Sequence, residues 1–406
     1  MRMSGEWRLF AKVTLPLAAL NLINQASRTV MAVIGPVLAL EFSLSASELG
    51  LLAACMFAAY AAAQLPEGLA LDRIGPRRLQ AALSLVTAAG FAVFALSEGF
   101  LGFAAARIVL GIGISAGLMA VLKANTEWFA PTSVARMSAI GGAIGVLGSM
   151  LTTVPAQAAL PFIGWRGVLW LLCAGSCAVA FWIFFSVPEK RASAAQPALR
   201  AEVAVMLSVC TSRTFWRYAP AVAMLSVLNF TYLGLWAGPW LRDVAGYAGP
   251  ARAATLLLYT FGMLAGVLVT GAVTSRAQAR GHPAKRILLA CNAGLLAAQI
   301  ALALGPSGAA VPILWVLFAF FAAGATSGYV VVGQMFRPEQ MGRVSTAVNA
   351  LTLVGAFLLQ SAIGAVLDLW PRTAHEGWDP RGYSAALALS AAIQAIVAVR
   401  LVRGRA

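Results

Sequence analysis

Residues 49–78 read LGLLAACMFAAYAAAQLPEGLALDRIGPRR, an apolar run that ends in a basic loop. A helix needs about 20 apolar residues to cross a bilayer, and residues 49–70 meet that length. Much of the chain has the same character, because 61% of its 406 residues are hydrophobic and only 11% are charged. Such a composition leaves too little polar surface for a water-soluble fold. We therefore expect an integral membrane protein.

Eleven further apolar runs of similar length flank this one. Together they predict twelve transmembrane helices, at residues 13–38, 49–70, 79–97, 100–123, 137–160, 167–187, 216–238, 252–273, 286–305, 311–334, 344–368 and 383–402. Because unpaired backbone groups are costly in hydrocarbon, spans of this kind should be α-helices and the fold should be all-α.

The basic residues are distributed as in a membrane protein rather than as in a nucleic-acid-binding protein. The net charge is +15, and the Lys and Arg residues gather at the two termini and in every second connection between runs. By the positive-inside rule both termini are expected to be cytoplasmic, which requires an even number of spans. We expect a monomer in the inner (plasma) membrane of a bacterium, with lipid and a small molecule as partners and no nucleic acid.

The chain divides into two similar halves. A polar stretch follows the sixth run, so we predict a bundle at 1–188, a cytoplasmic linker at 189–214 and a second bundle at 215–406. Two repeats favour this division. Residues 68–78 return in weaker form at 271–281, and Phe129-x-Pro131-x-x-x-x-Arg136-x-Ser138 returns as Phe336-x-Pro338-x-x-x-x-Arg343-x-Ser345. Two repeats at nearly one offset indicate two pseudo-symmetric six-helix bundles.

Two motifs carry a resemblance to a known family. They are Gly68-x-x-x-Asp72-Arg73-x-Gly75-x-Arg77-Arg78 and Arg107-x-x-x-Gly111-x-Gly113. Both resemble signature motifs of the major facilitator superfamily of secondary transporters, and the helix count, the linker and the half-repeat extend the resemblance along the whole chain. The resemblance implies that residues 68–78 form a gating motif, in which Asp72 contacts the cytoplasmic start of the eleventh helix and stabilises the outward-facing state. Alternatively, the arginines of this motif only anchor the topology.

Two arginines, Arg28 and Arg107, lie well inside predicted spans and at similar depths. A charge at the bilayer centre costs at least about 2.5–3.5 kcal/mol unless it faces a cavity or a partner. Asn21, Asn24 and Gln25 share one face of the first helix with Arg28 and form a polar stripe. We predict that these five residues line a wet interior cavity. The alternative for Arg107 is to hydrogen-bond only backbone carbonyls.

The second half supplies uncharged polar and aromatic residues for the same cavity. These are Asn229, Tyr232 and Trp236 in the seventh helix, Tyr329 in the tenth, and Asn349 and Gln360 in the eleventh. A central field set by two cations favours a small anion, such as a carboxylate that guanidinium binds with two hydrogen bonds. The alternative for each neutral residue is a structural role in tying helices together.

The arginine in the first helix and the sequence Gly164-Trp165-Arg166 resemble the organic-anion symporter branches of the superfamily. The resemblance is partial, because Ser27 and Ile114 stand where the anion:cation symporter pattern has acidic residues. The usual proton-carrying groups are therefore missing from this chain.

Glu67 is the remaining candidate for a proton site. It follows Tyr60 and Gln64 along one face of the second helix, near the cytoplasmic end of that helix. Its alternative role is that of an interfacial carboxylate beside the motif loop. Lys123 is expected to extend to the cytoplasmic surface and is left out of the site.

The leading hypothesis is a secondary active transporter that takes up a small organic anion by alternating access, driven by protons or another cation. The alternative is a proton-coupled drug or metabolite exporter of the same fold. Against it, the glycines of the fifth helix lack the adjoining Pro of the antiporter signature. No catalytic constellation supports an enzyme. The five cysteines and two histidines predict no disulfide framework, metal site or cofactor.

Overall fold

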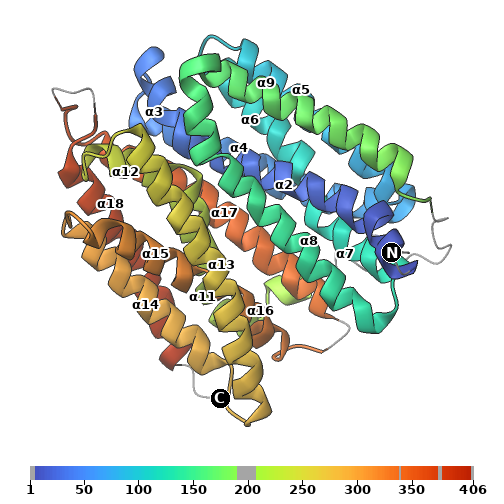
Figure 1. Cartoon of the computed structure of the whole chain (residues 1–406). Coiled ribbons are helices and arrows are strands. Elements are labelled where there is room, and N and C mark those ends of the chain that lie inside the picture. Colours follow the sequence, from blue (N-terminus) through green and yellow to red (C-terminus); the bar gives the residue numbers. More distant parts are fainter. Residues whose placement is uncertain (1–4, 190–206, 338–339, 374–376, 404–406) are drawn as a thin grey trace. The chain divides into compact units, whose positions relative to one another are not determined.

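The computed structural model describes residues 5–189, 207–337, 340–373 and 377–403, and all regular secondary structure within them is helical (Figure 1). In these ranges ten helical stretches are long and apolar enough to cross a membrane. They are Ala46–Gln64, Pro76–Leu96, Phe100–Trp128, Val154–Ser186, Arg213–Asp243, Gly249–Ala279, Lys285–Ala303, Ala310–Gly333, Met341–Leu367 and Pro380–Val402. The all-helical fold of a membrane protein is thus confirmed.

The other two predicted spans, 13–38 and 137–160, each cover parts of two helices. In the first, α2 (Leu15–Thr29) passes into α3 (Met31–Glu41) at Val30, where the backbone dihedrals stay helical; the second is divided at Thr152 and Thr153 between α8 (Pro131–Leu151) and α9 (Val154–Ser186). Thr29 precedes Val30 and Thr152 follows α8, and their hydroxyl oxygens lie 2.6 Å apart. Each hydroxyl also lies within hydrogen-bond distance of a backbone carbonyl of its own helix, that of Gln25 for Thr29 and that of Ser149 for Thr152. Such bonding bends helices. The count of twelve spans and the cytoplasmic termini stay predictions.

The first compact unit contains residues 1–44 and 51–194. In it α5 packs against α6 and α9, and α2 packs against α8. Gly164 has φ of +64°, which L side chains rarely adopt, and it divides α9 into two helical parts. Besides the helices already given, the unit contains α1 (Gly5–Leu9), the π-helical turn η1 (Phe10–Thr14), most of α4 (Ala46–Ile74), α5 (Pro76–Leu96), α6 (Phe100–Ile114) and α7 (Gly117–Trp128).

The second unit contains residues 45–50 and 195–406. Its α11 packs against α17, and its α14 against α18, which repeats the pairing of α2 with α8 and of α5 with α9. Most of the predicted linker and Pro338 of the repeat lie outside the described residues. The helices are α11 (Arg213–Thr231), η2 (Tyr232–Trp236), α12 (Ala237–Asp243), α13 (Gly249–Ala279), α14 (Lys285–Ala303), α15 (Ala310–Ala322), α16 (Ala325–Gly333), α17 (Met341–Leu367) and α18 (Pro380–Arg403).

The first turn of α4, which belongs to the second unit, is fixed by the end of α17. The backbone N–H groups of Ala46 and Ser47 donate to the two carboxylate oxygens of Asp368, at 2.9 and 2.8 Å. A carboxylate at a helix N-terminus satisfies orphan donors and complements the helix dipole. A Cβ at Gly364 would collide with the carbonyl of Ala46, so the close approach needs a glycine.

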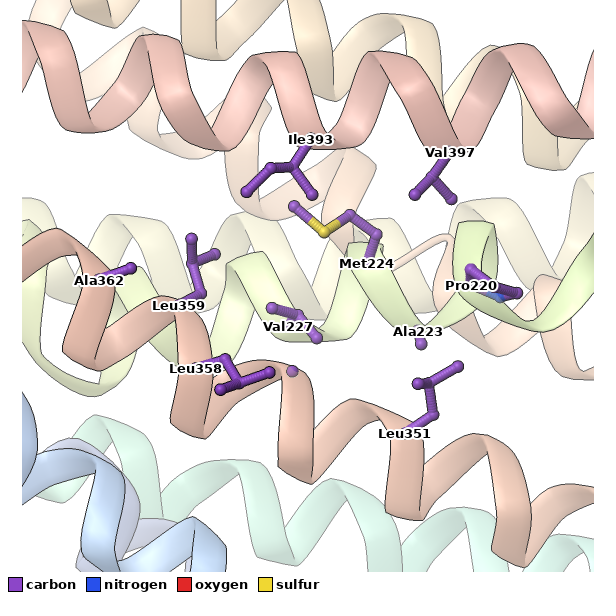
Figure 2. Close-up of a pocket in the computed structure, with 11 residues that line it drawn as sticks. Pro220, Ala223, Met224, Val227, Leu351, Leu358, Leu359, Ala362, Ile393 and Val397 are labelled. Carbon is purple, nitrogen blue, oxygen red and sulfur yellow. The ribbon is translucent and has the colours of Figure 1, made fainter. Parts of the chain in front are cut away.

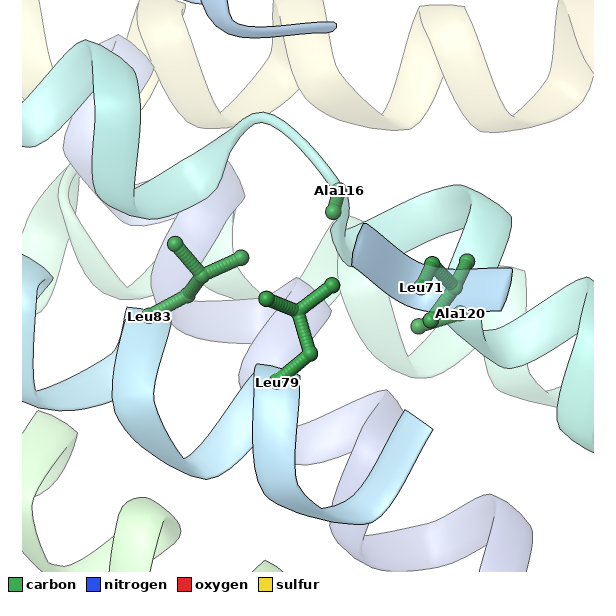
Figure 3. Packing of buried hydrophobic residues seen from close by; sticks show 5 residues of the cluster. All are labelled: Leu71, Leu79, Leu83, Ala116 and Ala120. Carbon is green, nitrogen blue, oxygen red and sulfur yellow. The ribbon is translucent and has the colours of Figure 1, made fainter. Parts of the chain in front are cut away.

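The far end of α4 is packed in the first unit by a small apolar cluster (Figure 3). Leu71 of α4 meets Leu79 and Leu83 of α5, together with Ala116 and Ala120 at and after the break between α6 and α7. The cluster holds the turn between α4 and α5 in place, and this turn carries the motif of residues 68–78.

Candidate functional site

Arg28 lies near the end of α2 and is half-buried. Its guanidinium carbon is 5.0 Å from the centroid of the Tyr60 ring of α4. Tyr60 is buried. A cation over an aromatic face keeps part of its stabilisation when water is removed. The pair therefore places a positive charge against a polarisable wall, on a residue that keeps part of its surface accessible.

Arg107 of α6 has a different environment, because it is 0% exposed and bonds to backbone carbonyls. Its Nη1 donates to the carbonyl of Ser27 at 3.0 Å and its Nε to that of Leu52 at 3.1 Å; Nη2 lies 3.5 Å from the carbonyl of Ala53. The structure therefore does not expose Arg107 to an aqueous cavity. Arg107 therefore holds α2 and α4 together. Its contact on α2 is Ser27, the residue that precedes Arg28.

The other residues of the α2 stripe contact neighbouring helices. Asn24 is buried and donates to the carbonyl of Ile114 at 3.4 Å, and a Cβ at Gly117 would collide with its amide. A Cβ at Gly145 of α8 would collide with the amide of Asn21 in the same way. Gln25 is half-buried. Two of the three polar residues thus fit against glycines of the first unit.

A second polar stripe runs along α4 from Tyr60 through Gln64 to Glu67. Glu67 is 8% exposed, and within the described residues neither carboxylate oxygen has a hydrogen-bond partner; the same holds for the side-chain oxygen of Gln64. Among the described residues the candidate membrane span of this helix is Ala46–Gln64, and Glu67 follows it in the same helix. Burial raises the pKa of the Glu67 carboxyl to about 8. The group is therefore poised to exchange a proton near neutral pH.

In the second unit the predicted residues occupy two kinds of place. Tyr232, Trp236 and Gln360 are buried, whereas Asn229, Tyr329 and Asn349 are half-buried. The Asn229 side chain accepts a bond from the Tyr259 hydroxyl at 3.1 Å, and the Trp236 indole donates to the backbone carbonyl of Gln360 at 3.3 Å. Tyr232 and Trp236 bound the π-helical turn η2, a feature frequent at functional sites.

Tyr232 belongs to a buried polar chain that we did not predict from the sequence. Its hydroxyl is 3.1 Å from that of Ser390, which donates to the Gln299 side chain at 2.9 Å. The Gln299 amide is hydrogen-bonded to Gln394, which in turn donates to Asn292. Asn292 and Gln299 are seven residues apart on α14, and Ser390 and Gln394 four apart on α18. Polar residues at helical spacing inside apolar runs were the available signal.

The motif of residues 68–78 is anchored to the end of α9. Gly75 has φ of +85°, which explains the glycine at this turn. Arg77 Nε donates to the carbonyl of Phe184 at 2.7 Å, and Arg78 forms an ion pair of 2.7 Å with Glu189. Arg73 is exposed, nothing contacts a Cβ built at Gly68, and the side chain of Asp72 lies outside what the structure describes.

Lys123, which we predicted to extend to the cytoplasmic surface, bonds to the end of α4. Its ammonium donates to the carbonyl of Leu71 at 3.0 Å, and the side chain is half-buried. The same carbonyl also accepts a bond from the backbone N–H of Gly75 at 3.1 Å, so Lys123 adds a second bond to the last turn of α4. Lys123 therefore supports the turn that carries the motif.

Glu41, at the end of α3, binds two residues of the sequence Gly164-Trp165-Arg166. The Trp165 indole donates to one carboxylate oxygen of Glu41 at 2.7 Å, and Arg166 forms an ion pair with the other at 3.0 Å. The left-handed Gly164 begins this turn. The motif thus joins the ends of two helices of the first unit.

A cavity of about 280 Å³ lies between α11, α17 and α18 (Figure 2). It contains none of the predicted substrate-binding residues, and no side chain in its lining could bind an anion. The lining consists of Pro220, Ala223, Met224, Val227, Leu351, Gly355, Leu358, Leu359, Ala362, Ile393 and Val397. Among the described residues no group of three or more His, Cys, Asp or Glu side chains could hold a metal ion.

Residues 17–359 match the profile of the Major Facilitator Superfamily. The chain is 30% identical over 146 residues to the probable L-galactonate transporter of Escherichia coli (strain K12), covering 36% of this chain and 32% of that protein. It is 29% identical over 228 residues to the chloramphenicol resistance protein of Streptomyces lividans, with 52% and 54% covered. Over 387 residues, 89% of each chain, it is 21% identical to the hexuronate transporter of Bacillus subtilis (strain 168). The chain thus spans about a third of the first relative and about half of the second.

Solved structures share the fold over nearly the whole chain. A bacterial homologue of the human lysosomal transporter Spinster, inward-facing and unoccupied, has a TM-score of 0.74 at 19% identity, with 98% of this chain and 96% of that chain covered. A D-xylose-proton symporter has a TM-score of 0.73 at 15% identity, with 96% and 97% covered. At these identities the likeness shows the fold.

Proposed function

This chain belongs to the Major Facilitator Superfamily, and from that premise we propose that it carries a small organic anion of the carboxylate class across the membrane. The family and the fold are those of transporters, so the chain is a transporter and not an enzyme. The proposal includes alternating access, uptake driven by protons or another cation, and a place in a bacterial inner membrane.

The observation that carries the proposal is the half-buried residue Arg28, whose guanidinium lies above the buried Tyr60 ring. A partly desolvated guanidinium binds a carboxylate through two parallel charge-assisted hydrogen bonds, which are stronger than neutral ones. Two relatives have names that refer to carboxylate sugars, hexuronate and L-galactonate. We assign Arg28 the substrate contact and Arg107 the task of fixing the backbone before it.

The coupling ion in this proposal is a proton carried by Glu67. The carboxyl is buried, has no hydrogen-bond partner among the described residues and lies two turns from Tyr60 on the same helix. Its pKa of about 8 allows protonation and release near neutral pH. Protonation would remove the cost of a buried negative charge.

Uptake of labelled glucuronate into proteoliposomes tests the substrate contact. We expect Arg28→Ala to lower uptake by roughly tenfold to a hundredfold, since hydrogen bonds to charged groups contribute about 1.5–3 kcal/mol. Arg286→Ala, which removes an exposed arginine of the second unit, is the control and should transport like the wild type. Transport by Arg28→Ala at the wild-type rate would reject the site.

The coupling role is tested separately. Glu67→Gln, which mimics the protonated carboxyl, should keep glucuronate exchange at equal concentrations while losing accumulation driven by a pH gradient. If the variant still accumulates substrate against a gradient, Glu67 does not carry the coupling proton.

The second candidate function is export of a drug or metabolite. The observation in its favour is the 29% identity to the chloramphenicol resistance protein over 228 residues. A susceptibility panel on a strain lacking the gene separates the two functions. Greater sensitivity to chloramphenicol with unchanged growth on hexuronates would favour export.

A further inference from the structure

A cavity of about 360 Å³ lies beside the N-terminal helix of the first unit. Its lining includes Arg8, Leu9, Lys12 and Val13 from α1 and η1, Trp128 from the end of α7, and Pro188 after the end of α9. A water molecule occupies about 30 Å³ in the liquid, so the space admits a group much larger than a single small ion. The lining thus combines two cations with apolar side chains, which makes this cavity amphipathic.

The positive charge of the cavity is not used within the protein. Arg8 and Lys12 are exposed, and in the part of the chain that the structure describes neither forms an ion pair or a hydrogen bond. The nearby acid, Glu6, is already committed to Arg136, at 2.7 Å. Bonds from Ser133 and Arg136 hold the pKa of Glu6 below its usual range, so it stays ionised and paired. The lining that the structure describes therefore carries two positive charges, on Arg8 and Lys12, and no negative charge.

The cavity lies where membrane-spanning segments end. Trp128 closes α7, the last part of the stretch Phe100–Trp128, and Pro188 lies two residues after the stretch Val154–Ser186. Trp7 is 44% exposed and packs edge-on against Phe10 at 5.5 Å. Trp side chains favour the headgroup level of a bilayer. Phe10 also joins Phe129 and Met137 in a buried cluster, which fixes η1 against the bundle.

We propose that this cavity binds the headgroup of an anionic phospholipid, with Arg8 and Lys12 on the phosphate and with the half-buried Leu9 and Trp128 against the glycerol and the start of the acyl chains. Basic pockets at the ends of membrane helices suit such headgroups, because they combine opposite charge with apolar contact. Free phosphate would satisfy the two cations but would leave the apolar lining without a partner. The inference rests on the membrane location of the chain and not on the transported substrate.

Binding of short-chain lipids to the purified, full-length protein in neutral detergent tests the proposal. We expect dioctanoyl phosphatidylglycerol to bind in isothermal titration, and Arg8→Gln/Lys12→Gln to weaken its binding by about 25-fold, at about fivefold for each cation. The control, Arg280→Gln/Arg286→Gln, removes two exposed arginines at another place and should change binding by less than about twofold. Equal weakening by both pairs would mean diffuse surface attraction and would overturn the site.

Two further ligands decide the chemistry. Dioctanoyl phosphatidylcholine that binds as tightly as phosphatidylglycerol would overturn the role of the cations. Inorganic phosphate that binds as tightly would assign the cavity to a free anion and overturn the lipid. If the double variant does not fold, Arg8→Gln and Lys12→Gln alone should each weaken phosphatidylglycerol binding about fivefold, and Arg8→Lys, which keeps the charge, should bind within about threefold of the wild type. Single variants with unchanged binding would also overturn the proposal.

Discussion

Arg28 and Arg107 are both cations within helices of the first unit, but their charges are compensated differently. Arg107 is sealed and directs its guanidinium at backbone carbonyls of two other helices. Arg28 is half-buried and lies over an aromatic ring. Removing hydrogen bonds to a buried group leaves unsatisfied carbonyls, whereas changing a half-buried cation alters mainly what that cation can bind. The same substitution should therefore lower the stability of the protein at Arg107 and weaken substrate binding at Arg28.

We expect Arg107→Lys to lower the free energy of unfolding by about 2–4 kcal/mol, because a compact ammonium cannot reach three carbonyls arranged around a planar fork. Arg28→Lys should change stability by less than about 1 kcal/mol and should instead raise the KM for the transported anion. Thermal unfolding and uptake kinetics of both variants provide the measurement. A raised KM with intact stability in Arg107→Lys would show that Arg107 contacts the substrate.

Glu67 gives a prediction of pH dependence. Its pKa is about 8 in the folded chain and near 4.5 when exposed, so between these values the folded state holds a proton that the unfolded state has released. Stability from this group is therefore complete below about pH 4.5 and is lost as the pH rises to about 8.

Glu67→Gln should abolish that loss. Relative to the wild type, the variant should become more stable as the pH rises across this window, and the difference should level off above it. Melting temperatures of both proteins over the same pH series are the measurement. A difference that is constant with pH would place an ionised Glu67 in the folded protein already at neutral pH.

At the scale of elements, α14 and α18 are joined by the chain of Gln299, Gln394 and Asn292, which reaches Ser390 and Tyr232. Hydrogen bonds between membrane helices contribute about 0.6–2 kcal/mol each. Satisfied networks of this kind fix one helix register, and a half-broken network is worse than an apolar contact.

We therefore expect Gln394→Leu to destabilise the protein by about 1–3 kcal/mol, because it leaves the buried amide of Gln299 without its partner. Gln299→Leu/Gln394→Leu should recover part of this loss, since both partners are then apolar. Thermal unfolding of the two single variants and the double variant closes the cycle. Additive losses would mean that the two amides are not coupled.

The elements were predictable to the extent that bilayer length determines them. Apolar runs located the helices, but not the helix boundaries at Val30 and Thr152, because the bond between Thr29 and Thr152 joins residues far apart in the sequence. Its place inside an apolar run likewise identified Arg107 as an intramembrane cation. It did not give its partners, which are backbone carbonyls and leave no trace in residue type.

For the candidate site, residue type was informative only where a polar side chain interrupts an apolar run. This signal identified Arg28, Tyr232 and Glu67, and it was equally present at Gln299 and Gln394. Whether such a residue faces a neighbouring helix depends on tertiary packing. Asn24, for example, fits against Gly117, and neither residue alone predicts the other.

At the scale of the whole molecule, the number of spans decides which connections share a side of the membrane. Glu98 follows the stretch Pro76–Leu96, and Arg280 follows Gly249–Ala279. The sequence predicts five spans between them, at 100–123, 137–160, 167–187, 216–238 and 252–273. An odd number places Glu98 and Arg280 on opposite sides, with the basic connection of Arg280 in the cytoplasm. If the interrupted helix α8 did not cross, both would lie on one side.

Labelling with a membrane-impermeant maleimide measures this parity. In a variant whose five native cysteines are replaced by serine, Glu98→Cys should react in intact cells. Arg280→Cys should react only after the membrane is opened, because the positive-inside rule keeps this connection in the cytoplasm. Retained uptake in the cysteine-free protein is the control for its fold. Reaction of both introduced thiols in intact cells would require an even number of spans between them and would contradict the twelve-helix topology. The segment that fails to cross would then be α8, which ends before Thr152.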